Sequence, residues 1–349
     1  MENLKIGKKI TIGKNDRCCI IAEVSANHGQ KFKKAVSLIK EAKKAGADAI
    51  KFQAYTPESL TLNIKKKPFL IKHSKWGGQS LYELYKKAFT PRTWFKELKN
   101  IAEGEGITFF ATAFDRESVD FLEELDVPFH KIASFELVDL ALIEYIAKTK
   151  KPVIMSTGMA NLREITEAVG VVKKYGQGKF ALLRCVSSYP ANPKEMNLKT
   201  IPDMKEIFKC PVGLSDHSLG SVISQAAVSL GADIIEKHFT LSRKIKTSDS
   251  FFSIEPKELK SLIRNIRTTE ASLGEISYGL TIGERKNKIF RRSLFAIEDI
   301  KKGEKITYKN IGSIRPGYGI SPKYLKSVIG KCAGKKIKKG TPLKFSIIK

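Results

Sequence analysis

Two histidines occupy similar positions in the sequence, each at or just beyond the end of a short apolar run. His217 follows the run at residues 211–216 (PVGLSD), and His238 lies inside the run at 233–239 (DIIEKHF). One such histidine is more often a hydrogen-bonded core residue, but two at matching depth on neighbouring strands favour a shared divalent cation. No cysteine or third histidine follows at a zinc-site spacing, which disfavours a closed zinc site. The pattern favours an open, roughly octahedral ion such as Mn²⁺, with Mg²⁺ and Co²⁺ as alternatives and Glu23 as the candidate carboxylate.

Two lysines fall inside predicted strands, Lys51 in AIKFQAY and Lys131 in FHKIASFE. A buried ammonium group is unfavourable unless an anion pairs with it. Small hydroxyl donors stand near the ends of other predicted strands, namely Thr112, Ser134, Ser156 and Ser215. Charges and hydroxyls brought together from several strands would suit a phosphate or a carboxylate. For any single hydroxyl, the alternative is an ordinary hydrogen bond to the backbone.

The elements that must position these residues alternate along the first three hundred residues. Short β-branched or aromatic runs, predicted to be strands, are separated by amphipathic segments of helical period. The runs cover residues 19–27, 49–55, 107–114, 129–136, 152–159, 180–189, 211–216 and 233–239. Eight βα units over about 260 residues predict an α/β protein with a TIM (β/α)8 barrel. In that fold, polar residues at the carboxyl ends of the strands face the active site.

A doubly wound sheet is the alternative fold, because periodicity does not reveal whether a sheet closes on itself. No G-x-G-x-x-G motif follows the first strand, so the dinucleotide-binding form of that fold loses support. Further polar residues at or just beyond strand ends are Asn27, His28, Gln53, Glu136, Thr157, Ser187, Tyr189 and Glu236.

The character of the sequence changes after Gly274. Residues 275–291 form a polar segment without sustained periodicity, which we interpret as a linker. Residues 292–349 contain short predicted strands separated by KKG, RPG and KKG turns. We therefore expect a barrel domain over 1–274, a linker over 275–291 and a small all-β domain over 292–349. A unit of about sixty residues is too small to hold much chemistry alone.

The chain of 349 residues carries a formal net charge of +27. Such a charge is compatible with nucleic acid, an acidic membrane surface or the steering of an anionic substrate. The lysines are spread along helical segments without interleaved aromatics, which favours a solvated surface and argues against a nucleic-acid partner. No apolar run reaches the ~18 residues needed to span a membrane, and the N-terminus lacks a signal-peptide pattern. Five cysteines without a C-x-x-C pair favour a cytoplasmic location.

Several motifs occur in the order found in one known enzyme family. They are IAEVSANH, IKFQAYTPESLT, HKIASFE, VIMSTGM, CVSSYP, GLSDHS and EKHF. From about residue 18 to its C-terminus, the chain resembles the sialic acid synthase family. These enzymes condense phosphoenolpyruvate with an amino-sugar aldose to give a nine-carbon 2-keto acid. The C-terminal segment, from RRSLFAIEDIKKGE to SIRPGYGI, resembles the family's SAF domain, which is related to type III antifreeze protein.

The resemblance implies a role for each matching residue. His217 and His238 would bind the divalent metal, and Glu23 would act near the water on that metal. The residues that would hold phosphoenolpyruvate are Lys51, Thr112, Lys131, Ser134, Ser156 and Ser215. The residues that would face the sugar are Gln53, Glu136, Tyr189 and Asp249. Of all these, the ones expected to act in catalysis are Glu23, Lys51, Lys131 and Glu136.

Arg315, in IRPGYGI, matches an arginine that the SAF domain of one subunit offers to the partner's active site. The resemblance therefore implies a homodimer in which the SAF domain is swapped over the partner's active site. The match is less close in SRKIKTSDSFFSIEP, around Asp249, where sialic acid synthases usually have a proline-rich version.

Within the family, AEVSANH, TPESLT and residues 76–91 are most similar to the pseudaminic acid synthases, whereas sialic acid synthases usually have glycine where Ser25 stands. The implied substrates are phosphoenolpyruvate and 2,4-diacetamido-2,4,6-trideoxy-L-altrose, and the products are pseudaminic acid and phosphate. Synthesis of N-acetylneuraminate or legionaminic acid is the alternative within the family. Outside it, the alternatives are a Schiff-base aldolase using Lys51 or Lys131, and a carbohydrate- or ice-binding tail on an inert barrel.

Overall fold

The computed structural model describes residues 3–6, 10–13, 16–72 and 75–349 of the chain. It divides into two compact units, Met1–Gly274 and Glu275–Lys349, and each is described here by itself. Among the helices within the described ranges, none combines the length and the apolar character that crossing a bilayer requires.

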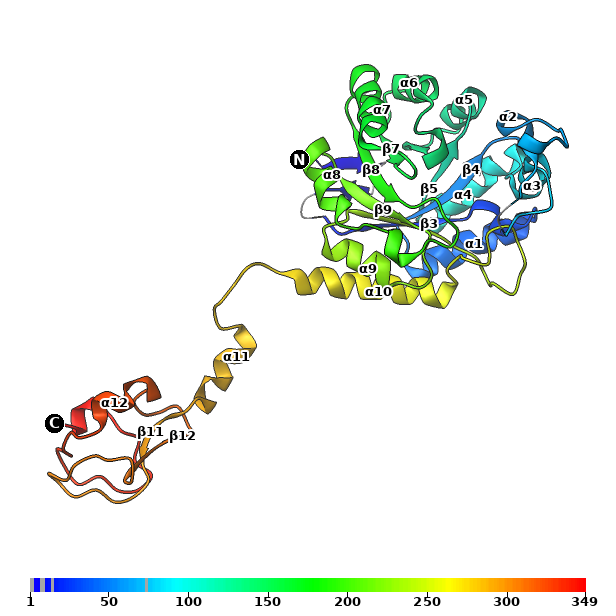
Figure 1. Ribbon diagram of the computed structural model, residues 1–349. Coiled ribbons are helices and arrows are strands. Elements are labelled where there is room, and N and C mark those ends of the chain that lie inside the picture. Colours follow the sequence, from blue (N-terminus) through cyan, green and yellow to red (C-terminus); the bar gives the residue numbers. More distant parts are fainter. Residues whose placement is uncertain (1–2, 7–9, 14–15, 73–74) are drawn as a thin grey trace. The chain divides into compact units, whose positions relative to one another are not determined.

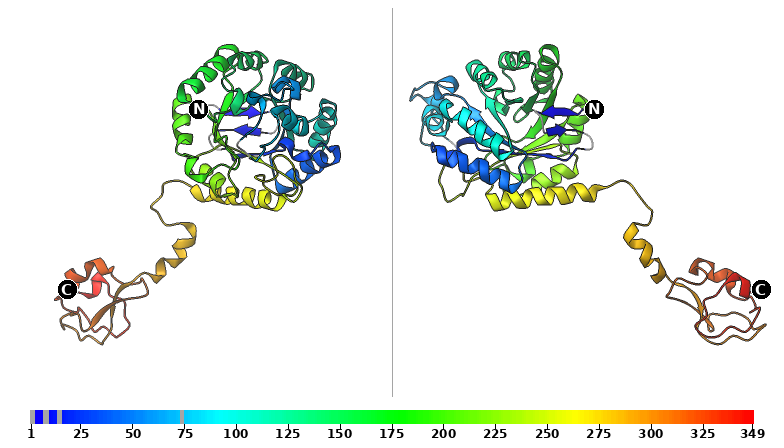
Figure 2. Two further views of the ribbon diagram at one scale, coloured as in Figure 1. Left: turned by 45° about the vertical axis from the view of Figure 1, so that its right-hand side comes forward. Right: turned by 180° about the vertical axis from the view of Figure 1, so that it is seen from behind.

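The first unit is a closed barrel of parallel strands surrounded by helices (Figures 1 and 2). Its strands are β3 (Cys19–Glu23), β4 (Ala49–Ala54), β5 (Thr108–Ala113), β6 (His130–Ile132), β7 (Val153–Ser156), β8 (Phe180–Cys185), β9 (Val212–Asp216) and β10 (Ile234–His238). The barrel closes because β10 pairs with both β9 and β3, which aligns His238 with Glu23. The predicted TIM barrel is confirmed, and the doubly wound alternative is wrong.

A helix covers the outside of the barrel after each strand, the last one following β10. These helices are α1 (Phe32–Ala45), α4 (Phe95–Glu105), α5 (Arg116–Glu124), α6 (Leu140–Lys148), α7 (Leu162–Tyr175), α8 (Thr200–Phe208), α9 (Val222–Ser229) and α10 (Pro256–Leu273). The connection from β4 to α4 also holds α2 (Pro57–Leu60) and α3 (Leu81–Ala88). In α1, Leu38, Ile39 and Ala42 are buried at helical spacing, so one apolar face packs against the barrel.

Several strands end earlier than the sequence predicted. After β3, residues Ser25–His28 form a 3-10 helix, and after β6 the same happens over Ser134–Glu136. The run predicted over 180–189 is a strand only as far as Cys185. Apolar residues remain buried beyond the strand ends, as Val24 and Ala26 do after β3 and Leu137 does after β6. Residue type alone therefore does not mark the last paired residue.

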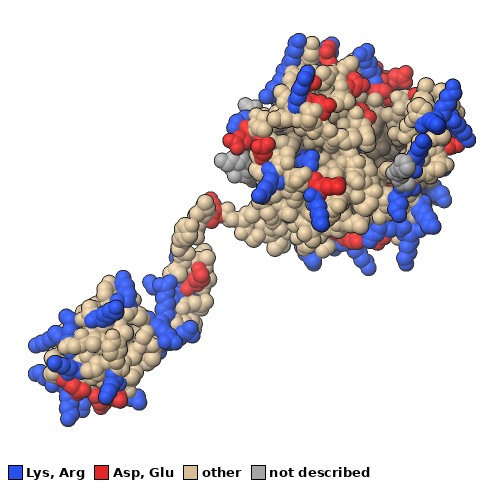
Figure 3. Space-filling model, in the orientation of Figure 1, with Lys and Arg blue, Asp and Glu red and all other residues tan. Residues whose placement is uncertain are grey.

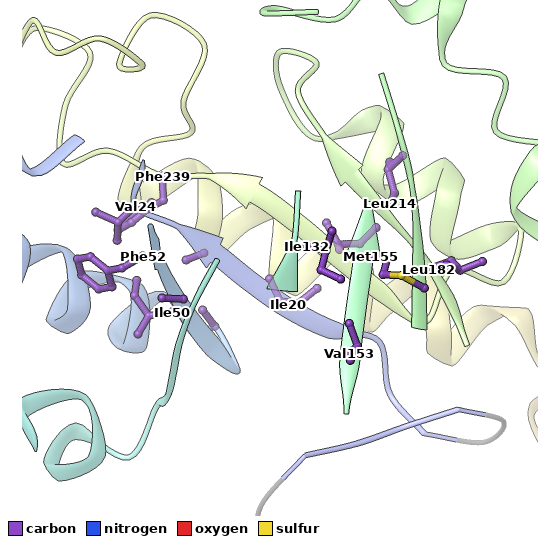
Figure 4. Close-up of a cluster of buried hydrophobic side chains, with 14 of the residues drawn as sticks. Ile20, Val24, Ile50, Phe52, Ile132, Val153, Met155, Leu182, Leu214 and Phe239 are labelled. Atoms are coloured by element: carbon purple, nitrogen blue, oxygen red, sulfur yellow. The ribbon is translucent and has the colours of Figure 1, made fainter. Parts of the chain in front are cut away.

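Alternate residues of each strand face opposite sides of the barrel wall. The outward side chains pack against the helices and form the main hydrophobic cluster of the unit. Figure 4 shows part of this cluster, with Ile20 of β3, Ile50 and Phe52 of β4 and Leu214 of β9. The inward side chains fill the interior of the barrel and line its mouth, at the carboxyl ends of the strands.

The inward residues near the amino ends of the strands form a second, apolar cluster. It contains Cys19, Ile21, Ala49, Phe110, Phe129, Ile154, Ala181, Leu183 and Ile234. A hairpin of β1 (Leu4–Ile6) and β2 (Ile10–Ile12) adds Leu4, Ile6 and Ile12 to the same cluster. The hairpin thus closes this end of the barrel (Figure 2). No strand was predicted over residues 4–12.

The second unit contains β11 (Ser293–Ala296), β12 (Ile311–Ile314) and α12 (Leu325–Val328). The two strands pair antiparallel, and the unit has its own apolar core, which includes Leu294, Ile306 and Val328. The glycines of the two predicted KKG turns, Gly303 and Gly340, each have a φ of 83°, which glycine adopts at little steric penalty.

The predicted linker segment contains a helix that the sequence analysis missed, α11 (Ile282–Asn287). Its start is stabilised by a capping box between Thr281 and Glu284. None of its residues is buried, so it has no apolar face that periodicity could have revealed.

Candidate active site

A cavity of about 520 Å³ lies at the carboxyl ends of the barrel strands. Every site residue predicted within the first unit lines it. These residues are Glu23, Lys51, Gln53, Thr112, Lys131, Ser134, Glu136, Ser156, Tyr189, Ser215, His217, His238 and Asp249. The remaining predicted residue, Arg315, directly follows β12 in the second unit.

The pleat of the strands explains why these residues meet. Lys51 stands two positions after the inward Ala49, Lys131 two after Phe129, and Ser156 two after Ile154. A spacing of two keeps a side chain on the same face of a strand. The apolar cluster at the closed end and the polar cavity at the mouth are therefore successive layers of the same inward face.

Lys51 has carboxylate partners within the protein. Its Nζ lies 2.9 Å from Glu236 Oε1 and 3.4 Å from Glu23 Oε2, and all three side chains are at most 5% exposed. Burial lowers the pKa of Lys51, but the two carboxyl groups more than offset this and raise it above its usual value. Lys51 is thus already paired within the protein, and its expected contact with an anionic ligand stays a prediction. Glu236 was noted only as a strand-end residue, although its spacing of two from His238 indicated a shared face.

Glu23 and Glu236 have different proton affinities although they flank the same ammonium group. Burial raises the pKa of Glu23 to about 7, against the lowering effect of Lys51. Burial also acts to raise the pKa of Glu236, but Lys131 and Lys51 together lower it below its usual value. One carboxyl group can therefore exchange a proton near neutral pH while the other stays ionised. Two neighbouring carboxyl groups whose pKa values differ in this way suit acid–base chemistry.

Lys131 is in the opposite situation to Lys51. Its side chain is 1% exposed, and its Nζ donates to Ser156 Oγ at 2.7 Å and to the carbonyl of Ile132 at 3.0 Å. Across the described ranges, no carboxylate lies within ion-pair distance of this Nζ. Burial lowers the pKa of Lys131 to about 8, although Glu236 acts to raise it. This ammonium group is the one that an anionic ligand would stabilise.

Hydroxyl groups and a backbone amide adjoin Lys131. Ser134 Oγ accepts a hydrogen bond of 3.1 Å from the amide of Gly158. A Cβ atom at Gly158 would lie only 2.7 Å from that oxygen, so only glycine leaves this space open. Thr112 Oγ1 is buried and has no hydrogen-bond partner in the described part of the chain. This side of the cavity brings an ammonium group and hydroxyl groups together.

The two histidines face each other, with ring centroids 5.3 Å apart. His217 Nδ1 is 2.9 Å from the carbonyl oxygen of Val186, a bond that fixes the tautomer and leaves Nε2 free to bind a cation. His238 Nδ1 is buried and unpartnered among the residues described. Burial holds the pKa of His238 well below its usual value, so its ring is neutral, as a metal ligand must be.

The expected carboxylate ligand from Glu23 is not brought to the histidines. Over residues 3–6, 10–13, 16–72 and 75–349, no group of three His, Cys, Asp or Glu side chains could hold a metal ion together. The two imidazoles still fit an open site, since substrate and solvent oxygens can complete an octahedral shell.

A buried ion pair stands directly behind the histidines. Asp216 precedes His217, Lys237 precedes His238, and the two charged groups lie 2.8 Å apart between β9 and β10. Both side chains are almost fully buried, and Lys237 also donates to the carbonyl of Ser218 at 2.7 Å. The pair links the two strands at the depth of the histidines. The sequence analysis did not identify it.

The wall opposite Lys131 presents hydrogen-bond acceptors. Asp249 Oδ2 accepts from Ser25 Oγ at 2.6 Å, and Gln53 Nε2 donates to Ser25 Oγ and to Glu23 Oε1, each at 2.9 Å. Asp249 lines the cavity even though the sequence around it matched the family less closely. Sequence reasoning missed Ser25 as a site residue, although it had noted an unusual serine there.

An aromatic wall adjoins the histidines; its Tyr189 was predicted from the sequence, whereas Phe252 and Trp76 were missed as site residues. The ring of Tyr189 lies 4.3 Å from that of His217, and the ring of Phe252 lies 4.8 Å from that of His238. Trp76 contacts Tyr189 at 5.5 Å and donates to the carbonyl of Ser248 at 2.7 Å. Trp76 belongs to the connection between β4 and α4. The unusual length of this connection is the sequence feature that could have indicated a contribution to the site.

Some polar residues at strand ends serve the fold. Asn27 donates to the carbonyl of Phe239 at 3.0 Å and to Ser253 Oγ at 2.9 Å. His28 Nε2 is 3.0 Å from Thr90 Oγ1, and burial lowers the pKa of His28 to about 4. Neither residue lines the cavity.

The positive charge of the chain is dispersed. Figure 3 shows Lys and Arg side chains scattered over the visible face of both units, with Asp and Glu between them on the first. A scattered pattern of this kind agrees with the solvated surface inferred from the sequence.

Models of two known families match the chain. The NeuB family matches residues 38–278, and the SAF domain matches residues 291–348. Pseudaminic acid synthase of Campylobacter jejuni is 46% identical over 93% of this chain and 95% of its own length. Pseudaminic acid synthase of Helicobacter pylori is 42% identical over 93% and 96%.

Other relatives carry different names. N,N'-diacetyllegionaminic acid synthase of Campylobacter jejuni is 41% identical over 91% of this chain and 96% of its own. Among solved structures, an N-acetylneuraminic acid synthetase from Leptospira borgpetersenii, crystallised with citrate, superposes with a TM-score of 0.74. It is 37% identical and covers 82% of this chain and 95% of its own.

Proposed function

The chain belongs to the NeuB family, and from that premise we propose that it condenses phosphoenolpyruvate with 2,4-diacetamido-2,4,6-trideoxy-L-altrose to give pseudaminic acid and phosphate. The choice of sugar rests on the 42–46% identity to pseudaminic acid synthases. The observation that carries the choice of an anionic co-substrate is Lys131, a buried ammonium group that lacks a carboxylate partner within the described chain.

Phosphoenolpyruvate would bind on the Lys131 side of the cavity. Lys131 and the hydroxyls of Ser134 and Ser156 would bind its anionic oxygens. Thr112 and Ser215 would add donors, and Lys51, which is paired with Glu23 and Glu236, would add its positive charge. Groups fixed by separate strands keep the substrate in register with the sugar, which removes much of the entropic barrier.

His217 and His238 would hold a divalent cation, which we propose to be Mn²⁺, with Mg²⁺ or Co²⁺ as alternatives. When bound, this cation would supply Lewis-acid activation of the sugar aldehyde. The neutral ring of His238 and the fixed tautomer of His217 support this assignment.

The reaction then follows from the positions of the chain's own groups. C3 of phosphoenolpyruvate forms a bond to the aldehyde carbon as the aldehyde C=O π bond breaks. Water adds its oxygen to C2, and Glu23, whose pKa is about 7, accepts one proton of that water and passes it to the former aldehyde oxygen. The C2–O bond to phosphate then breaks and the C2 hydroxyl gives its proton to the departing phosphate, which leaves a ketone at C2 and free inorganic phosphate.

The sugar would lie against the acceptor wall. Gln53 and Asp249 belong to that wall, and Tyr189 and Glu136 line the same cavity. Burial raises the pKa of Glu136 to about 7, so this carboxyl group can carry a proton at neutral pH and donate it to a sugar oxygen.

A Schiff-base aldolase is less well supported. Lys51 is paired with two carboxyl groups and its pKa is raised, so its amine is not available as a nucleophile. Lys131 could lose its proton near pH 8, but an aldolase would make no use of paired histidines.

We also propose a homodimer in which Arg315 reaches the partner's active site. Large apolar side chains are exposed in the loops after β6, β7 and β9 and at the first residues of α7 and α9, at the mouth of the barrel. They are Phe135, Val138, Met159, Leu162, Leu219 and Val222. In the second unit, Ile314 and Tyr318 are exposed on either side of Arg315. Apolar surfaces of this kind on both units support burial against a second copy.

We place the reaction in the cytoplasm. All five cysteines are free, and four of them are buried. Free buried thiols are typical of proteins that stay in a reducing compartment.

Phosphate release from phosphoenolpyruvate tests the proposal. The protein is incubated with the trideoxy diacetamido altrose, the corresponding legionaminic acid precursor or N-acetylmannosamine, each with Mn²⁺ or with EDTA. We expect release only with the altrose and only with metal. Release with another sugar would reassign the substrate, release in EDTA would remove the metal role, and no release with any sugar would reject the synthase assignment.

A further inference from the structure

Ser25 has a backbone conformation that residues with a side chain rarely adopt. Its φ is 46°, in the left-handed region where glycine is tolerated without steric penalty. The residue is 4% exposed and lines the candidate active site. Strained residues of this kind persist only where the surroundings hold them, and they gather at functional sites.

The hydroxyl of Ser25 links three separate segments of the barrel. Ser25 follows β3, and its Oγ donates to Asp249 Oδ2 at 2.6 Å in the loop after β10. The same oxygen accepts from Gln53 Nε2 of β4 at 2.9 Å. The amide of Ala26 also donates to Asp249 Oδ2, at 3.3 Å. Glycine would relieve the backbone but would remove the group that joins Gln53 to Asp249.

These hydrogen bonds decide which atoms remain for a ligand. They use one oxygen of Asp249 and the amide nitrogen of Gln53. Within the described residues, no group donates to Asp249 Oδ1 or Gln53 Oε1. Both remaining atoms are acceptors, so this wall suits a neutral ligand with hydroxyl or amide N–H donors. A carboxylate at this wall would repel phosphoenolpyruvate.

We propose that Ser25 is a positioning residue for the sugar, which holds Gln53 and Asp249 so that their free oxygens accept from its hydroxyl or acetamido N–H groups. The inference rests on the proposed function and deepens it. The strained serine is retained for its hydroxyl, because glycine would serve the backbone better.

Two variants of the full-length protein separate the hydroxyl from the backbone. Ser25→Gly removes the hydroxyl and relieves the conformation, whereas Ser25→Ala removes the hydroxyl and keeps the strain. We expect both to raise KM for the altrose by about tenfold, because such a change corresponds to the loss of one or two hydrogen bonds. KM for phosphoenolpyruvate should stay within about twofold in each, because Lys131 is untouched. The melting temperature of Ser25→Gly should equal or exceed that of the wild type, while that of Ser25→Ala should not rise.

Asn197→Gly is the matched control. Asn197 also has a φ of 46°, but it is exposed and does not line the cavity. Glycine at this position should keep or raise the melting temperature, because it relieves the same backbone strain. Both KM values should stay unchanged. Calorimetric titration of each variant with the altrose gives a readout that does not depend on turnover, and affinity should fall in parallel with the rise in KM.

The outcomes distinguish the inference from the function on which it rests. An inactive wild type would overturn both. An active wild type with an unchanged altrose KM in Ser25→Gly would overturn only the role of Ser25. Equal changes in both KM values, together with a lower melting temperature in Ser25→Gly, would show a purely structural role and likewise reject the proposal.

Discussion

The two ends of the barrel interior are built from the same strands and the same inward face, yet they hold opposite kinds of side chain. At the closed end, Phe110 and Phe129 pack with ring centroids 4.1 Å apart beneath an apolar hairpin. At the mouth, two residues further along those strands, stand Thr112 and Lys131. The side chains at the closed end pack against one another, whereas among the described residues Lys131 has no carboxylate partner and Thr112 Oγ1 has no hydrogen-bond partner. Depth along a strand therefore separates groups that stabilise the barrel from groups that bind a ligand.

The largest effect should come from the closed end. Phe110→Ala leaves a cavity beside Phe129 and should lower the free energy of unfolding by about 3–5 kcal/mol. The kcat/KM of the folded protein should stay within about twofold, because no group at the mouth changes. Urea denaturation and steady-state kinetics measure the two quantities. A large loss of kcat/KM with full stability would break the division between the two ends.

Lys131→Met should do the reverse at the mouth. It removes the ammonium group expected to bind phosphoenolpyruvate, and kcat/KM should fall by about 10²–10³-fold. The free energy of unfolding should not fall, because an ammonium group without a carboxylate partner is unfavourable to bury.

Lys51→Met is the matched control for that prediction. It leaves Glu23 and Glu236 buried without their cation, so the free energy of unfolding should fall by about 3–5 kcal/mol. Equal stability losses in the two lysine variants would contradict the distinction drawn between them.

A smaller effect is expected from pH. The pKa of Lys131 is about 8, so its ammonium form is lost from the free protein as pH rises through that value. An anionic ligand favours the ammonium form. KM for phosphoenolpyruvate should therefore be flat below pH 8 and rise above it by about tenfold per pH unit. Kinetics from pH 6.5 to 9.5 would show this, and Lys131→Arg should abolish the rise because guanidinium keeps its proton.

The smallest effect should come from trimming the hairpin. Ile12→Val removes one methyl group from the apolar cluster and should lower the free energy of unfolding by about 0.5–1.5 kcal/mol. Kinetic constants should not change. If KM rose instead, the hairpin would influence the mouth, and the two ends of the interior would not be independent.

The barrel fold and most polar residues that line the cavity could be predicted from the sequence alone. The alternation of strand and helix patterns predicted the barrel, and polar residues near strand ends predicted the members of the cavity, from Lys131 and Ser156 to His217 and His238. Both features are local. Residue type and a period of two are properties of each strand by itself, so they can be read without knowing what the strand packs against.

Only the tertiary structure decided how those residues are paired. Barrel closure by β10 brings Glu236 to Lys51, so this ammonium group has a carboxylate partner inside the protein that the sequence did not predict. The loop after β10 brings Asp249 to Ser25, and the hairpin closes the far end of the barrel. These contacts join residues far apart in the chain, and their energies depend on distance and burial. Residue type sets what each group can do, but only the closed barrel sets which partner it meets.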